Sequence, residues 1–124
     1  MRMMITAGFA LAIAATPVHA EGDAAKGEQV FKKCMACHAI ADKANKVGPS
    51  LLGVVGRPVA TAEGYKYSDS MKELAAKGAA WDEASLDNYL TNPKVLVPKG
   101  KMAFAGLKDE AQRKDLIAFL AARK

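Results

Sequence analysis

The chain has 124 residues, of which 25% are charged, and its formal net charge is +5 at pH 7. This length predicts one domain with a small hydrophobic core. The basic residues fall in no recognised nucleic-acid-binding motif, so the charge gives no reason to expect a nucleic-acid partner. There are only two cysteines, three positions apart, and a disulfide across so short a loop would stabilise the fold little.

The amino-terminal segment differs from the rest of the chain. Arg2 precedes an uncharged, mostly apolar run, and the VHA sequence at 18–20 has the small residues of a signal-peptidase site. A Thr-Pro pair ends the run well short of the about 20 residues that a spanning helix needs, so an uncleaved anchor is the weaker alternative. We expect a signal peptide over 1–20, cleaved after Ala20, and a single exported domain over 21–124 in the periplasm.

Removal of this segment would simplify the set of possible metal ligands. The formal net charge falls to +4, because Arg2 is the one charged residue that is lost. A single histidine remains, His38, together with three methionines: Met35, Met71 and Met102.

Helical periodicity and capping residues predict an all-α domain with Gly- and Pro-rich loops. The first helix is expected over about 23–33, and the second follows Asp82, a good N-cap, and ends before Pro93. The third is expected over about 109–122, where apolar residues recur at helical spacing. A short helical segment is expected over 70–76, and strand signals are weak.

The motif Cys34-Met35-Ala36-Cys37-His38 follows the first predicted helix and is typical of covalent attachment of haem c. Two thiols at this spacing can add to the two vinyl groups of one porphyrin. The imidazole that follows then lies beneath the ring, where a nitrogen can reach the iron. One covalently bound haem would also complete a core that is small for an exported domain.

Three other interpretations of the cysteine pair compete with haem attachment. A thioredoxin-type dithiol expects a βαβ setting, and no strand precedes the motif. A structural zinc site needs four Cys or His ligands, whereas residues 21–124 contain three. A plain disulfide leaves the adjacent histidine unexplained.

The second axial ligand of the iron is expected to be Met102. With one histidine, ligation by two histidines within the chain is excluded, and the His–Met pair is the combination found in cytochromes c. Met35 lies between the two cysteines and cannot cross the ring. Met71 falls in the predicted helix over 70–76, where core packing is the simpler role. Met102 lies in a Pro- and Gly-containing loop that can cover the opposite haem face.

The chain resembles the class I c-type cytochromes, specifically the cytochrome c2 and mitochondrial-type branch, over essentially all of residues 23–123. The resemblance rests on an ordered set of motifs: Cys34 to His38, Gly48-Pro49-x-Leu51-x-Gly53-x-x-Gly56-Arg57, Gly64-Tyr65-x-Tyr67, Trp81, Asn92-Pro93, PKGKMAF at 98–104 followed by Ala-Gly, and DLIAFL at 115–120. It implies a cytochrome c fold, with three main helices, short helical segments and loops wrapped around one haem.

The resemblance also implies contacts near the two axial ligands. The carbonyl of Pro49 would accept a hydrogen bond from His38, which fixes the imidazole and raises its basicity. Tyr89 would approach the Met102 sulfur, and Phe104 would shield the haem edge. At the helix crossing, the family pattern implies a close approach of the first and last helices at Gly27, beside Phe31 and Phe119.

Other matched positions concern the haem propionates. Arg57, Tyr67 and Trp81 would hydrogen-bond around a buried propionate, directly or through water. Two positions depart from the family: Gly100 stands where a threonine or serine commonly holds a propionate, and Met71 stands where many relatives carry a polar residue. We therefore expect the loop that carries Met102 to lack one of the family's usual hydrogen bonds.

The function implied is that of a soluble periplasmic one-electron carrier, not an enzyme. Members of this family shuttle electrons from a bc-type quinol-oxidising complex to a photosynthetic reaction centre or a terminal oxidase. The alternative is a haem enzyme or gas sensor with an open axial position, such as a peroxidase-like c-type protein. A Met102 ligand argues against that alternative, as does the lack of a spare distal histidine.

The resemblance implies that six lysines surround the exposed haem edge, where we expect them to dock partners; the alternative is an ordinary solvated basic surface. A basic docking face accelerates encounter by electrostatic steering, by about 10- to 1000-fold, and loses its effect with salt. We therefore expect acidic docking faces on the partner complexes, no stable membrane insertion and a monomeric protein. The lysines in question are Lys32, Lys33, Lys94, Lys99, Lys101 and Lys108.

Overall fold

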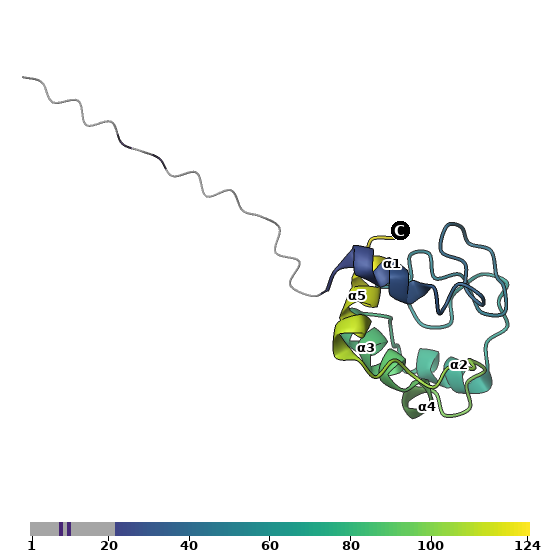
Figure 1. Ribbon diagram of the computed structural model, residues 1–124. Coiled ribbons are helices and arrows are strands. Elements are labelled where there is room, and N and C mark those ends of the chain that lie inside the picture. Colours follow the sequence, from purple (N-terminus) through teal and green to yellow (C-terminus); the bar gives the residue numbers. More distant parts are fainter. Residues whose placement is uncertain (1–7, 9, 11–21) are drawn as a thin grey trace, which may run out of the picture.

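The computed structural model describes residues 8, 10 and 22–124, so the signal peptide expected over 1–20 lies outside the described residues except at those two positions. The described part is all-α, as predicted, and its only β pairing is an isolated bridge between Pro58 and Ala80. Its helices, shown in Figure 1, are α1 (Ala24–Phe31), α2 (Asp69–Ala76), α3 (Glu83–Thr91), α4 (Pro93–Leu96) and α5 (Glu110–Ala121).

Each helix begins at a side chain that accepts a backbone N–H from the first turn, which satisfies donors that the helix itself leaves unpaired. These caps are Asp23, Ser68, Asp82, Asn92 and Asp109. The predicted caps at residues 23 and 82 are therefore confirmed. The predicted helices over 23–33, 70–76 and 109–122 differ from the observed bounds by one or two residues at an end.

The role expected of Pro93 is correct but incomplete. It follows the end of α3 as predicted, and it is also the first residue of α4, a helix that the periodicity did not indicate. Proline suits the first helical position, because its missing N–H would have no partner there and its φ is already helical. The chain therefore turns sharply at Asn92, and α4 directs it toward the loop that carries Met102.

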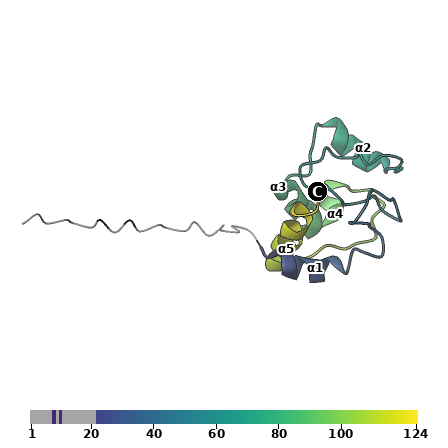
Figure 2. The same cartoon turned by 90° about the horizontal axis from the view of Figure 1, so that it is seen from above.

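The first and last helices cross closely at Gly27, as expected. A Cβ at this position would overlap the backbone carbonyl of Asp115 and would lie 2.7 Å from the Phe119 Cβ. The rings of Phe31 and Phe119 pack in a tilted arrangement with centroids 5.2 Å apart, and the Asp23 N–H donates to the Asp115 carboxylate at 2.8 Å. Figures 1 and 2 show α1 lying against α5 in both views.

The crossing of α1 and α5 divides the rest of the fold into two sides. The loop after α1 lies on one side, and α2 and α4 lie on the other (Figure 1). Helix α2 contains no fully buried residue, so it depends on partly buried side chains such as Met71 for its packing. No helix in the described part of the chain is long and apolar enough to cross a membrane.

Candidate haem site

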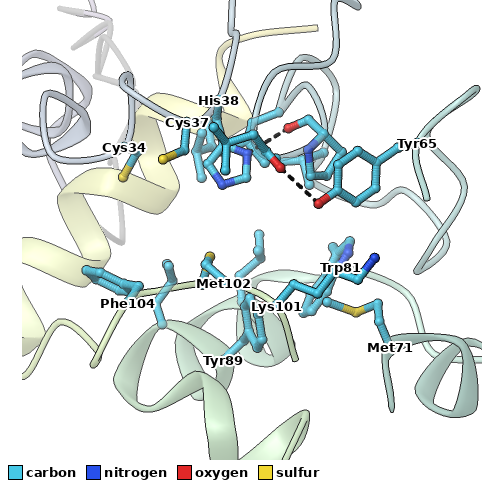
Figure 3. A pocket seen from close by; sticks show the side chains of 18 of the residues that line it. Cys34, Cys37, His38, Tyr65, Met71, Trp81, Tyr89, Lys101, Met102 and Phe104 are labelled. Atoms are coloured by element: carbon cyan, nitrogen blue, oxygen red, sulfur yellow. Dashed lines mark hydrogen bonds between the residues drawn. The ribbon is translucent and has the colours of Figure 1, made fainter. Parts of the chain in front are cut away.

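One cleft collects all the cofactor-binding residues predicted from the sequence and two of the six predicted docking lysines. Its lining includes Cys34, Cys37 and His38 from the segment after α1 and, across from them, Met102 and Tyr89. Figure 3 shows the two groups facing each other. The cleft leaves about 1370 Å³ unfilled by protein atoms, counting its open mouth.

The first wall of the cleft, called here the histidine wall, consists of residues 34–49. Helix α1 ends at Phe31, and the chain continues in tight turns: the Cys34 N–H donates to the Phe31 carbonyl at 2.7 Å and the His38 N–H to the Cys34 carbonyl at 2.9 Å. These turns hold both thiols and the imidazole at the same cleft. Burial raises the pKa of the Cys34 thiol, as does the neighbouring Cys37, while Lys33 acts in the opposite direction.

The two thiols are free and do not form the plain disulfide considered above. Among the described residues, no cluster of three or more His, Cys, Asp and Glu side chains has the geometry of a metal site. A zinc site built from the cysteine motif would therefore lack its remaining ligands.

The imidazole of His38 is held by two neighbours. Its Nδ1 donates to the Pro49 carbonyl at 2.7 Å, which directs Nε2 away from this bond and leaves it available as a metal ligand. Gly48 packs against the ring, since a Cβ there would lie 2.8 Å from Nδ1 and 2.9 Å from Nε2. Burial lowers the His38 pKa, the Pro49 bond opposes this, and Lys46 lowers it further, so the neutral form that binds metals is favoured.

The opposite side of the cleft is built by α3 and by the segment between α4 and α5, called here the methionine loop (residues 97–109). Tyr89 is 8% exposed, and its ring lies 4.9 Å from the Trp81 ring between centroids. Burial, with a smaller contribution from Tyr65, raises the pKa of Tyr89 to about 12. Met102 and Phe104 are half-buried and line the cleft from this loop, and Met71 lines it from α2.

A guanidinium group borders the cleft near the histidine wall. Arg57 donates from Nη1 and Nη2 to the Ser50 carbonyl, at 3.2 Å each, and from Nη1 to the Leu52 carbonyl at 3.4 Å. Its Nε is buried and has no partner within the described residues. An unpaired buried donor is costly, so this nitrogen fits a cofactor that brings a carboxylate into the cleft.

The other two residues expected near a propionate also line the cleft. The Tyr67 hydroxyl accepts the Ala62 N–H at 2.9 Å, so its own proton remains available to a further acceptor. Trp81 is buried beside Tyr89, on the side of the cleft opposite the histidine wall. A largely apolar cleft with two free thiols, an oriented imidazole, a thioether opposite it and an unpaired guanidinium nitrogen fits haem c.

The six lysines named for docking are all exposed, but they do not all border the cleft. Lys33 and Lys101 are part of its lining. The ammonium of Lys101 donates to the Lys66 carbonyl at 3.0 Å, and that of Lys108 donates to the Thr91 carbonyl at 2.8 Å. The remaining four, Lys32, Lys94, Lys99 and Lys108, lie outside the lining.

Two hydrogen bonds around the site were not predicted from the sequence. The Lys46 ammonium donates to the Met35 carbonyl at 2.7 Å and so holds the short segment between the two cysteines. The Tyr65 hydroxyl donates to the Val47 carbonyl at 3.0 Å at the edge of the cleft. A lysine or tyrosine in a loop gives no local signal of such a contact, because its partner is a backbone carbonyl up to 18 positions away.

Comparisons with known proteins agree with this geometry. The family model for cytochrome c matches residues 24–124. The chain is 53% identical over 97 residues to cytochrome c-550 of Ancylobacter novellus, covering 77% of this chain and 91% of the relative. It is 51% identical over 104 residues to cytochrome c2 of Rhodomicrobium vannielii, covering 83% of this chain and 81% of that protein.

A solved structure extends the similarity to the fold. Cytochrome c2 from Rhodospirillum centenum superposes with a TM-score of 0.78 at 39% identity, covering 83% of this chain and 99% of that chain. The chain therefore belongs to the class I cytochrome c family, close to cytochromes c2 and mitochondrial-type cytochromes c, and it is a cytochrome c2-like electron carrier with haem c attached at Cys34 and Cys37.

Proposed function

We propose that this protein carries single electrons on a haem whose iron is bound by His38 and Met102. The observation that carries the proposal is that these two side chains face each other from opposite sides of one cleft (Figure 3). When bound, haem c supplies an iron that alternates between ferrous and ferric states. The chain contributes the two ligands, the covalent attachment and a largely apolar surrounding.

The residues around the ligands keep this arrangement fixed during electron transfer. The Pro49 carbonyl holds the imidazole of His38 in one orientation. The buried rings of Trp81 and Tyr89 exclude water from the side on which Met102 lies. Arg57 would donate from its unpaired Nε to a propionate oxygen and neutralise part of its charge.

Replacement of Met102 tests the ligand assignment. We expect Met102→Ala to remove the weak far-red absorption band of methionine bound to ferric iron. The reduction potential should fall by on the order of 0.1 V or more, because axial ligands set potentials over a range of about 0.8 V. Met71→Leu is the matched control, a second methionine of the same cleft, and should keep the band. A band that survives Met102→Ala but disappears in Met71→Leu would reverse the assignment.

The competing function is a haem enzyme or gas sensor with an open axial position. It predicts rapid binding of carbon monoxide to the reduced wild-type protein, whereas a Met102-ligated iron binds the gas slowly. Stopped-flow mixing with carbon monoxide distinguishes the two. Wild-type binding as fast as that of Met102→Ala would favour the competing function.

We also propose that the cleft edge docks acidic faces of membrane redox complexes, a bc-type donor and a reaction centre or oxidase as acceptor. Lys33 and Lys101 line the cleft, and Lys94 is exposed on α4. Neutralising these three together should slow electron transfer at low salt about tenfold or more, since steering acts on encounter. Neutralising Lys26, Lys77 and Lys124, all exposed and outside the cleft lining, is the matched control. Equal rates for the two triple variants would contradict the docking proposal.

The remaining proposals concern location and assembly. We infer export to the periplasm with cleavage after Ala20, supported by the leader-like composition of residues 1–20 and by the similarity to a bacterial cytochrome c2. Expression in a bacterium that matures haem c should give a product that begins at residue 21, measurable by mass spectrometry. Sedimentation should show a monomer.

A further inference from the structure

The methionine loop has no secondary structure of its own between its two ends, so its position depends on contacts with other elements. At its start, Val97 is 1% exposed and its carbonyl accepts the Gly100 N–H at 3.1 Å. Between 100 and 109 the backbone forms no helix or turn. The contacts at its far end, 106–108, therefore decide how firmly the segment with Met102 is held.

A buried arginine of α5 donates two of the four hydrogen bonds that hold 106–108, and the Lys108 ammonium donates another to the Thr91 carbonyl. Arg113 is 9% exposed, and its Nη1 donates to the carbonyls of Leu107 at 3.0 Å and Lys108 at 2.9 Å. Its Nε donates to a carboxylate oxygen of Asp87 in α3 at 2.7 Å. The Leu107 N–H in turn donates to the Leu90 carbonyl at 2.7 Å. One side chain thus joins α5, α3 and the end of the methionine loop.

The backbone beside this arginine leaves little space for adjustment. Gly106 has a φ of +113°, and a Cβ there would overlap the Thr91 carbonyl at the end of α3. The loop therefore crosses α3 in contact with its backbone. The other attachments of the loop are exposed: Lys99 donates its N–H to the Ser70 hydroxyl at 3.3 Å, and Lys101 donates to the Lys66 carbonyl at 3.0 Å.

We propose that Arg113 is a positioning residue for Met102, because it fixes the end of the methionine loop to α3 and α5. The inference rests on the proposed ligation of iron by Met102. Arg113 does not line the cleft, so it acts through Leu107 and Lys108 and not on the haem itself. Removal of its guanidinium takes the Arg113 donor from one buried carbonyl, that of Leu107, and from one partly buried carbonyl, that of Lys108, and this cost falls on the folded loop. The loop then opens more often while the helices remain folded.

The test follows two signals in ferric, haem-loaded protein during a denaturant titration. One is the far-red band of iron-bound methionine, and the other is far-UV circular dichroism of the helices. In Arg113→Gln we expect at least tenfold more folded protein without the band at the same denaturant concentration. Arg113→Lys keeps the positive charge, so it should lose the band less readily than Arg113→Gln and more readily than the wild type. Lys114→Gln, the next residue of α5 and partly exposed, should leave the band unchanged relative to the helices.

A purely structural role would give a different result. Band and dichroism would then shift together in Arg113→Gln, and the proposal would be wrong. If Arg113→Gln does not fold, Asp87→Ala replaces it: this change removes the Nε partner and keeps both carbonyl bonds. We expect a smaller shift of the band in the same direction, and an unchanged band relative to the helices would overturn the proposal.

Hydrogen exchange separates this inference from the ligand assignment. Exchange of the amides over 99–107 should become at least tenfold faster in Arg113→Gln, while amides of α1 keep their wild-type rates. This readout does not require methionine to bind iron. A wild-type protein without the far-red band would refute the ligation by Met102, and the exchange rates would still decide whether Arg113 holds the loop. Unchanged exchange over 99–107 would refute the role of Arg113.

Discussion

The two sides of the haem cleft hold the two proposed iron ligands in different ways. His38 belongs to a short segment in which two cysteines, the Pro49 hydrogen bond and the packing of Gly48 all act within 15 positions of one another. Met102 belongs to a loop without helices, held at its far end by residues of α3 and α5 and nearer its start by exposed bonds of Lys99 and Lys101. His38 is therefore secured by local contacts, whereas the position of Met102 depends on the tertiary fold. Met102 should be the first of the two to leave its place in the cleft.

The largest difference between the two sides is expected from adding one methyl group to each. Gly48→Ala places a Cβ within 3 Å of the His38 ring and should lower the free energy of unfolding by about 3 kcal/mol, because overpacking a tight site forces its neighbours to move. Gly100→Ala is the matched change in the methionine loop, where the nearest atom is the Val97 Cγ1 at 3.0 Å. It should cost about 1 kcal/mol or less, because the overpacking against one side-chain methyl is partly offset by the lower entropy of the unfolded alanine chain. Equal losses in a denaturant titration would remove the contrast between the two sides.

Alkaline pH is expected to weaken the methionine side through Tyr89. Its pKa is about 12 in the folded protein, compared with 10.0 ordinarily, so folding favours the neutral phenol. The resulting stability is fully present below pH 10 and is lost as pH rises toward 12, by on the order of 2 kcal/mol. Tyr89→Phe cannot ionise and should lack this loss. Unfolding measured from pH 8 to 12 checks the prediction, and parallel curves for the two proteins would contradict it.

A hydrogen bond on the histidine side of the cleft offers a smaller test. The Tyr65 hydroxyl, from the segment before α2, donates to the carbonyl of Val47 in the histidine wall at 3.0 Å. Tyr65→Phe keeps the ring, which lies edge-on to Tyr67 with centroids 4.8 Å apart, and removes only the donor. We expect a loss of about 1 kcal/mol in the free energy of unfolding, measured by denaturant titration. No loss would mean that this bond contributes nothing to the stability of the histidine wall.

The smallest effect is expected at the exposed bond between α2 and the methionine loop. Ser70→Ala removes the hydroxyl that accepts the Lys99 N–H at 3.3 Å and should cost about 0.5 kcal/mol, since a long, exposed bond contributes little net stability. Ser70→Thr keeps the hydroxyl and is the control. Hydrogen exchange at residue 99 should be faster in the alanine variant alone. A loss as large as that of Gly48→Ala would show that the loop is held mainly from α2.

Local chemistry explains which parts of the fold could be predicted from the sequence. The cysteine motif is contiguous, and a cap such as Asp82 acts on a backbone amide three positions away, so both are visible in a short stretch of sequence. Helix α4 was missed because four residues are too few for periodicity to appear, and its only signal is Pro93 after a capping Asn92. Gly27 was identified from the family pattern, and the contact with Asp115 supplies its physical reason.

The sequence by itself determined the attachment of haem at Cys34 and Cys37 and restricted the histidine ligand of residues 21–124 to His38, because both follow from residue identity and spacing. Only the tertiary structure revealed the unpaired Nε of Arg57 and the hydrogen bonds of Arg113 to the end of the methionine loop. Both arginines donate to backbone carbonyls, which every residue carries and which therefore leave no trace in the sequence. The side chain that faces His38 across the cleft is likewise placed by contacts that only folding creates.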